Sequence, residues 1–153
     1  MVERLPAIVP DTSVIIKWYR QEEVLAAKAL KLREDYRAGS VQLLAPELLA
    51  YEMANVLVFK SHLSYDEIQQ AIHDLYDTEL EWQSLTPSLL ERACELARQH
   101  RTTAYDAVFL ALAESAGASL LTADAKLVRK LSSESRVMFL GDYTAEDLTN
   151  LRP

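Results

Sequence analysis

The stretch AIVPDTSVIIKWY (residues 7–19) places the polar triplet DTS between two apolar runs. Residues 6–10 are short and apolar, which predicts a buried strand. Thr12 or Ser13 can then cap a short helix that continues to about residue 19. Asp11 therefore comes directly after the strand, at its carboxyl end, where it interrupts a segment that otherwise reads as buried.

Short apolar strands alternate with helices along the rest of the chain. Further strands are predicted at residues 40–45, 82–85, 118–122 and 136–140, and helices at residues 22–38, 46–59, 64–80, 87–100, 104–116 and 124–131. The segments lack tight hairpin signals, so the strands should pair in parallel, with helices on both faces. We predict an α/β fold, a three-layer α/β/α sandwich with a central, mainly parallel sheet. Residues 1–145 should form this single domain, and residues 146–153 a short C-terminal tail.

Composition limits the functional classes. A chain of 153 residues is long enough for one sizeable core. Apolar runs fall well short of the roughly 20 residues that cross a membrane, so we expect a soluble protein. The N-terminus does not have the residue order of a signal peptide, and one cysteine, Cys94, excludes an internal disulfide, so we expect a cytoplasmic location. The net charge of −7 argues against broad, non-specific affinity for nucleic acid.

Four acids stand in apolar surroundings. Asp11 and Asp124 each follow a predicted strand and precede a helix, whereas Glu52 and Asp106 lie on largely apolar helices. Each has a plainer interpretation when it is taken alone. Asp11 and Asp124 could be helix caps, and Glu52 could be a solvated flank. Asp106 could pair with an arginine or cap the helix that begins after Thr103.

Taken together, the four acids predict a metal site. In a parallel sheet, sites form beyond the carboxyl ends of the strands, so these carboxylates should converge on one rim. Carboxylates that close repel one another unless cations neutralise them. Because the set lacks cysteine and paired histidine ligands, it indicates Mg²⁺ or Mn²⁺ rather than zinc.

Three segments together resemble a known family. They are VPDTSVIIKWY, APELLAYEMANVL and TTAYDAVFLALAESAGASLLTADAKL, and in this order and spacing they resemble the PIN-domain ribonucleases, specifically the VapC toxins of toxin–antitoxin modules. The resemblance runs from about Ile8 to Leu140. One position departs from the pattern, because Arg101 stands in the turn before the third acid, where relatives often have glycine.

The resemblance implies an activity and assigns residues to it. It implies a homodimer that depends on Mg²⁺ or Mn²⁺, cleaves single-stranded RNA and is inhibited by a cognate antitoxin. The family's acids fall on Asp11, Glu52, Asp106 and Asp124, with hydroxyls at Ser13 and Thr122. Our hypothesis is metal-assisted phosphodiester hydrolysis, with Asp11 and Asp106 as direct ligands. Glu52 and Asp124 would bind a second ion, hold metal-bound waters or help deprotonate the nucleophile, while the two hydroxyls orient carboxylates or waters.

A basic face and three other functional classes complete the predictions. Lys126, Arg129 and Lys130 are spaced to share one face of a helix, where they would either guide RNA phosphates or form a solvated surface. One alternative function is a non-catalytic PIN-like module that binds RNA or protein, and another is a housekeeping nuclease. A phospho-aspartate protein is disfavoured, because DTS lacks the second acid that such sites carry.

Overall fold

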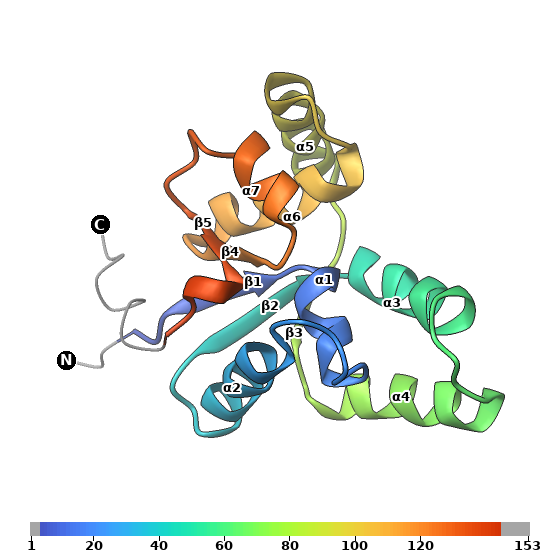
Figure 1. The fold of residues 1–153 in the computed structure, drawn as a ribbon. Coiled ribbons are helices and arrows are strands. Elements are labelled where there is room, and N and C mark those ends of the chain that lie inside the picture. Colours follow the sequence, from blue (N-terminus) through green and yellow to red (C-terminus); the bar gives the residue numbers. More distant parts are fainter. Residues whose placement is uncertain (1–3, 145–153) are drawn as a thin grey trace.

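Five parallel strands form the centre of residues 4–144, the part of the chain that the computed structural model describes (Figure 1). Their order across the sheet is β3-β2-β1-β4-β5, and every neighbouring pair is parallel. The register pairs Ile8 of β1 with Leu43 on one side, and Val9 with Leu120 on the other. The strands are β1 (Ala7–Pro10), β2 (Gln42–Pro46), β3 (Glu81–Gln83), β4 (Ser119–Thr122) and β5 (Val137–Phe139).

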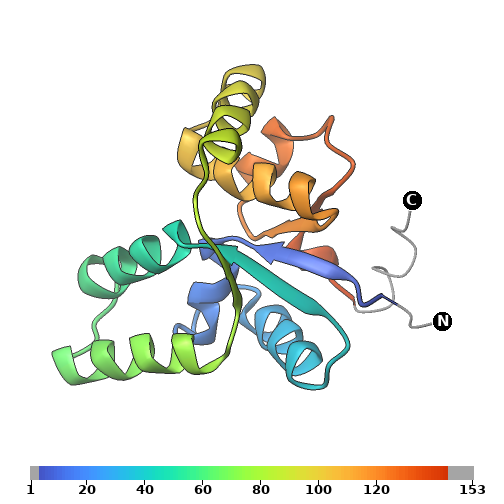
Figure 2. The ribbon, with the colours of Figure 1, turned by 180° about the vertical axis from the view of Figure 1, so that it is seen from behind.

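Helices cover both faces of this sheet, which confirms the predicted three-layer fold. Helices α1 to α4 lie on one side and α5 to α7 on the other, an arrangement that Figures 1 and 2 show from opposite directions. The α-helices are α1 (Thr12–Ile15), α2 (Ala26–Arg37), α3 (Leu48–Phe59), α4 (Tyr65–Asp77), α5 (Pro87–His100), α6 (Ala104–Ala116) and α7 (Ala125–Lys130), with short 3₁₀ helices η1 (Ile16–Trp18) and η2 (Leu140–Asp142).

The core lies on both faces of the sheet, and helix α6 fills much of one of them. Ile8 and Val9 of β1, together with Leu120 and Leu121 of β4, are almost entirely buried. Every residue from 107 to 113 of α6 is also buried, because this helix lies between the sheet and α5. The apolar run of α6 is thus explained by burial on most sides, and polar side chains of this helix reach the surface in its first and last turns.

The strand order reverses direction between β1 and β4. From β1 the chain moves to β2 and β3 on one side, and β4 and β5 then occupy the other side. In a parallel sheet such a reversal opens a crevice at the carboxyl ends of the two central strands. The Asp11 amide donates to the Leu121 carbonyl oxygen at 3.0 Å, so the β1–β4 pairing extends one residue beyond β1 into this crevice.

The structure corrects the predicted start of the second helix. The helix was expected from residue 22, but α2 begins at Ala26, since Leu25 has left-handed backbone angles (φ 68°). Glu23 is instead engaged by Lys17 at 3.1 Å and by Arg20 at 3.4 Å. The predicted tail, residues 146–153, lies outside the described residues. Among helices of residues 4–144, none has the length and apolar character needed to span a bilayer.

Candidate functional site

Asp11 occupies the carboxyl end of β1 and is only 8% exposed. Its Oδ1 accepts hydrogen bonds from the Ser13 amide at 3.0 Å and from the Ser13 hydroxyl, so Asp11 itself caps α1. Burial raises the pKa of Asp11 to about 6, and the negative charge of Asp106 contributes, although hydrogen bonding from Ser13 and Thr122 opposes the shift. The carboxylate is therefore held in a position where its negative charge is poorly solvated.

Ser13 and Thr122 join the ends of the two central strands. The Ser13 hydroxyl oxygen accepts a hydrogen bond from the Ala123 amide at 2.8 Å and lies 3.4 Å from the Thr122 hydroxyl oxygen. Thr122 is fully buried, and its hydroxyl oxygen accepts from the Asp124 amide at 3.1 Å. These contacts place both predicted hydroxyls behind the carboxylate of Asp11, where they fix its orientation.

Glu52 projects from the second turn of α3. Because α3 follows β2, its N-terminus lies at the same edge of the sheet as Asp11. The Thr12 hydroxyl donates to Glu52 Oε1 at 2.9 Å. Burial raises the pKa of this half-buried carboxyl, and Asp106 raises it further, although the hydrogen bond from Thr12 lowers it. The prediction that Thr12 or Ser13 caps α1 was wrong, because Asp11 is the cap and Thr12 instead holds Glu52.

Asp106 lies in the first turn of α6 and is half-buried. The Thr103 hydroxyl oxygen caps the helix by accepting from the Asp106 amide at 3.0 Å, which leaves the carboxylate free of the capping role. The Thr102 hydroxyl donates to Asp106 Oδ2 at 3.2 Å. The preceding turn contains Arg101 in the left-handed region (φ 54°), a conformation that glycine adopts without strain. Arg101 therefore has the backbone conformation that a glycine would adopt in this turn, and it adds a side chain there.

Asp124 takes a different position from the other three acids. It is exposed, and its Oδ1 accepts from the amides of Lys126 at 2.9 Å and Leu127 at 3.2 Å, which caps α7. Its charge is not among the influences on the pKa of Asp11 or Glu52. Asp124 therefore lies at the rim of the site, and its Oδ1 is used to cap α7.

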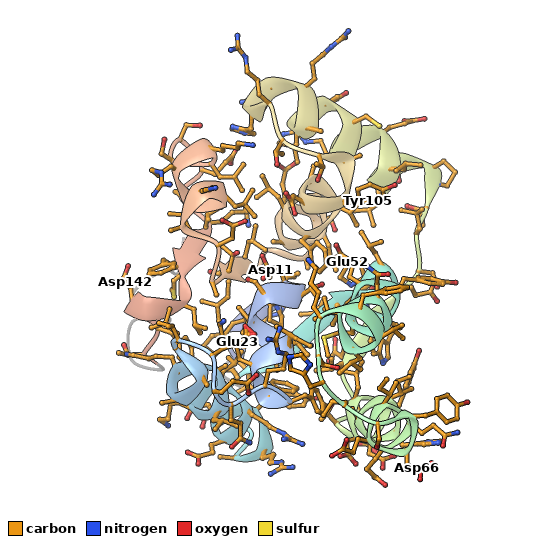
Figure 3. The ribbon with its side chains drawn as sticks, turned by 45° about the vertical axis from the view of Figure 1, so that its right-hand side comes forward. Asp11, Glu23, Glu52, Asp66, Tyr105 and Asp142 are labelled. Atoms are coloured by element: carbon orange, nitrogen blue, oxygen red, sulfur yellow. The ribbon has the colours of Figure 1, made fainter. Side chains whose placement is uncertain are left out.

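Asp11, Glu52 and Asp106 form an acidic cluster, defined by the charge of Asp106, which acts on both of the other acids. Figure 3 labels two of its members, Asp11 and Glu52. None of the ion pairs within residues 4–144 involves these residues or Asp124. A half-buried carboxylate pair beside a buried one is unfavourable without a cation, and oxygen donors suit a hard divalent ion. Across the described residues no three acids, histidines or cysteines are already arranged as a metal-binding group. The donor set fits Mg²⁺ or Mn²⁺, and binding would require the carboxylates to turn toward one another.

The sequence analysis missed two hydroxyl side chains that contact the acidic cluster. Thr12 and Thr102 each donate a hydroxyl hydrogen bond to one acid, Glu52 and Asp106 respectively. The available signal was only that a hydroxyl follows Asp11 directly and that another precedes Asp106 by four residues. Neither spacing indicates a partner 40 residues away, as for Thr12 and Glu52.

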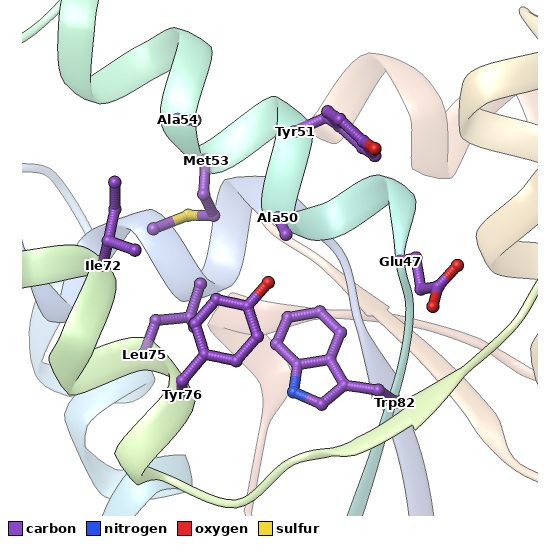
Figure 4. Close-up of a pocket in the computed structure, with 9 residues that line it drawn as sticks. All are labelled: Glu47, Ala50, Tyr51, Met53, Ala54, Ile72, Leu75, Tyr76 and Trp82. Carbon is purple, nitrogen blue, oxygen red and sulfur yellow. The ribbon is translucent and has the colours of Figure 1, made fainter.

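A separate groove of about 640 Å³ lies between α3, α4 and β3 (Figure 4). The rings of Tyr76 and Trp82 stack along one wall with centroids 5.3 Å apart. Tyr51 stands at its edge and Met53 lies deeper. None of the four predicted acids lines this groove, so it is distinct from the acidic cluster.

Comparison with known proteins assigns the chain to a family. The profile of the PIN domain family matches residues 8–131. Ribonuclease VapC3 of Pyrobaculum aerophilum is 34% identical over 130 residues, which cover 80% of this chain and 93% of that protein.

Solved structures share the fold. A toxin–antitoxin complex from Klebsiella pneumoniae contains a chain that superposes with a TM-score of 0.65 at 17% identity, over 87% of this chain and 97% of that chain. A protein of Pyrobaculum aerophilum superposes with a TM-score of 0.61 at 23% identity, over 95% of this chain and 96% of that chain. The matched segment contains every predicted site residue, from Asp11 to Lys130, and the chain belongs to the PIN-domain family.

Proposed function

We propose that this chain is a metal-dependent endoribonuclease and the toxin component of a type II toxin–antitoxin module. Its relative VapC3 is named a ribonuclease, and a neighbour of the same fold occurs in a toxin–antitoxin complex. The observation that carries the proposal is the carboxylate of Asp11, which is buried at the carboxyl end of β1. The negative charge of Asp106 acts on it, and within residues 4–144 it forms no ion pair with a cation.

Divalent-metal chemistry accounts for this arrangement. Asp11 and Asp106 would hold Mg²⁺ or Mn²⁺ directly, with Glu52 and Asp124 able to bind a second ion or metal-bound waters. When bound, such an ion lowers the pKa of a water molecule and stabilises the leaving oxygen of a phosphodiester. The unfavourable proximity of the carboxylates then becomes the source of affinity for the ion.

Glu52 and the hydroxyl side chains around the acids would accept a proton and orient the carboxylates. Glu52 is half-buried with a raised pKa, which suits it to accept a proton from the attacking water. Thr12 orients Glu52, Thr102 orients Asp106, and Ser13 with Thr122 orients Asp11. Each acid thus has its own hydroxyl donor, which would steady the carboxylate once it has turned toward a bound ion.

The proposal also names partners. The substrate would be RNA, with Lys126, Arg129 and Lys130 on the exposed face of α7 attracting its phosphates toward the rim at Asp124. The protein would act in the cytoplasm as a homodimer, restrained by a cognate antitoxin. The resemblance in the sequence supports the RNA substrate and the homodimer, and the toxin–antitoxin complex among the structural neighbours supports the antitoxin.

Cleavage of labelled single-stranded RNA under titration with Mg²⁺ tests the activity. We expect turnover that requires the metal and is abolished in Asp106→Asn, with the thermal melting curve retained. Asp66→Asn is a matched control, because Asp66 is an exposed first-turn acid on α4, far from the cluster (Figure 3). Unchanged turnover in pure Asp106→Asn would contradict the proposal, and metal-independent binding without cleavage would favour the non-catalytic module.

Induction in cells tests the toxin assignment. We expect growth arrest with the wild type, no arrest with Asp11→Asn, and rescue by a co-expressed cognate antitoxin. Active enzyme without growth arrest would instead identify a housekeeping nuclease.

A further inference from the structure

Helix α3 is apolar on its solvent side as well as on its core side. The core side consists of three almost completely buried residues at a spacing of four, which are Leu49, Met53 and Leu57. Residues 51, 55 and 59 repeat this spacing on another face of the helix. Tyr51 is 76% exposed, Phe59 is 77% exposed, and Asn55 between them is also exposed. We call Tyr51, Asn55 and Phe59 the α3 stripe. Exposed aromatic side chains at such a density mark an interaction surface.

The α3 stripe is left uncovered by residues 4–144. The helix packs mainly against α1, α4 and β2, and Figures 1 and 2 both show it at the periphery of the described part of the chain. The Tyr51 ring stands at the outer edge of α3, beside the groove of Figure 4. Within the same residues the side-chain amide of Asn55 makes no hydrogen bond. The stripe therefore has both apolar area and hydrogen-bonding groups to offer to another molecule.

The chemistry of the α3 stripe is symmetrical about Asn55. One aromatic ring lies four residues before this asparagine, and the other lies four residues after it. The asparagine amide has both donors and an acceptor, so it can hydrogen-bond to a second copy of itself. A two-fold dimer interface needs such self-complementarity, because one surface serves both copies. A different protein partner would impose no symmetry on the stripe, which favours a second copy of this chain.

Charge and area favour the same occupant. The chain has a net charge of −7, so two copies repel each other over most of their surfaces. The α3 stripe and the neighbouring Val58, which is 54% exposed, carry no charge, so this face can meet its own copy without opposing like charges. With about 150–250 Å² for a whole aromatic side chain, Tyr51, Phe59 and Val58 present on the order of 400 Å². That area suits the apolar centre of a standard interface, which covers about 800 Å² per partner.

We propose that α3 pairs antiparallel with α3 of a second copy about a two-fold axis at Asn55, an inference that rests on the homodimer of the proposed function. In this register Tyr51 of one copy lies level with Phe59 of the other, and the two Asn55 amides hydrogen-bond to each other. Glu52 lies on one flank of the stripe, and a two-fold axis perpendicular to both helices keeps both copies of Glu52 on the same side of the pair. The two acidic clusters then open toward one face of the dimer.

Directed cross-linking tests the register. The full chain is used with Cys94→Ser, which removes the exposed native thiol, and a new cysteine is oxidised in air with copper phenanthroline. Asn55→Cys should give an interchain disulfide in most of the protein, because facing positions of helices packed about 8–10 Å apart come within disulfide reach. Gln69→Cys is the matched control, since Gln69 is exposed on α4 and outside the stripe, and it should give little cross-linked product. Equal cross-linking of the two variants would overturn the register.

Sedimentation of the otherwise native chain tests the interface without an oxidant. We expect a wild-type dimer, and Phe59→Asp should raise the Kd of the dimer at least about tenfold, because it sets like charges against each other at the contact. Phe59→Leu should stay dimeric. Val24→Asp is the control for added charge, since Val24 is 81% exposed on the loop before α2, and it should leave the dimer intact. Unchanged thermal melting would show that the variants are folded.

The outcomes separate this inference from the proposed nuclease activity. A monomeric wild type, or a Phe59→Asp variant that dimerises as tightly as the wild type, would overturn the inference and leave metal-dependent RNA cleavage untouched. A Phe59→Asp variant that stays dimeric but no longer binds a co-expressed antitoxin would assign the stripe to the antitoxin and also overturn it. Cleavage by Asp106→Asn would contradict the nuclease mechanism, whereas cross-linking at residue 55 would still establish the dimer.

Discussion

The Thr12 hydroxyl donates a hydrogen bond of 2.9 Å to Glu52 Oε1, which links the residue after the first strand to the second turn of α3. The bond joins two helices that start at neighbouring strand ends. It also lowers the pKa of a carboxyl that burial raises, so it favours the ionised form of Glu52. A side chain that appeared to be a helix cap is thus a contact to the acidic cluster.

Thr12→Val should lower kcat for RNA cleavage roughly tenfold, because Glu52 loses the donor that orients it. Thr12→Ser keeps the hydroxyl and should retain most of the activity. In a double-mutant cycle with Glu52→Gln, the two losses should not add, as expected for residues in direct contact. Full additivity would show that Thr12 acts independently of Glu52.

Asp11→Asn should stabilise the metal-free protein. The pKa of Asp11 is about 6 in the folded protein and 3.8 unperturbed, so between these values the folded state binds more protons than the unfolded state. Stability from this group is therefore present below about pH 4 and is lost as the pH rises through about 6. At neutral pH the neutral asparagine should raise the free energy of unfolding by about 3 kcal/mol.

Urea denaturation of both proteins at several pH values measures this difference. The gap between wild type and Asp11→Asn should be small near pH 4 and should open up to about pH 6. Added Mg²⁺ should then stabilise the wild type and leave the variant unaffected. A constant gap at all pH values would contradict the raised pKa of Asp11.

Asp124 carries two separable roles, a helix cap and a negative charge. Asp124→Asn keeps a good capping side chain and should leave stability unchanged, whereas Asp124→Ala should cost about 1 kcal/mol. If the charge serves metal binding, both variants should require more Mg²⁺ for half-maximal cleavage. Equal Mg²⁺ dependence of Asp124→Asn and the wild type would restrict Asp124 to its observed contacts with Lys126 and Leu127.

Arg101→Gly should stabilise the protein by about 1 kcal/mol, because Arg101 has left-handed backbone angles that glycine adopts without steric cost. Arg101→Ala should give no such gain, since alanine keeps the Cβ atom. Arg98→Gly provides the opposite control, because Arg98 lies inside α5 and glycine there should cost about 1 kcal/mol. Thermal denaturation of the three variants compares these effects directly.

Neutralising the basic face of α7 should reduce the salt dependence of RNA binding. If Lys126, Arg129 and Lys130 contact phosphates, replacing all three by glutamine should lower the slope of log affinity against log salt by up to about 2, at roughly 0.7 per contact for single strands. Arg37→Gln is the control, because Arg37 is exposed on α2 in the opposite helical layer (Figure 1). An unchanged slope in the triple variant would mean that this face is only solvated.

The sequence by itself determined most of the helices and strands, and it singled out the four acids as candidates. The bounds of α5 and α6 agree with the prediction to the residue, since Pro87 starts one helix and Gly117 ends the other. A capping box between Ser64 and Glu67 marks the start of α4. These features depend on local capping and on apolar periodicity, which a sequence displays directly.

Only the tertiary structure decided which side chains meet. The strand order β3-β2-β1-β4-β5 places Asp11 and Glu52 where the charge of Asp106 acts on both, and it leaves Asp124 on the rim, capping α7. The hydrogen bond from Thr12 to Glu52 follows from the same packing. The physical reason is that contacts between residues far apart in sequence form only when the sheet buries its core, so no local pattern encodes them.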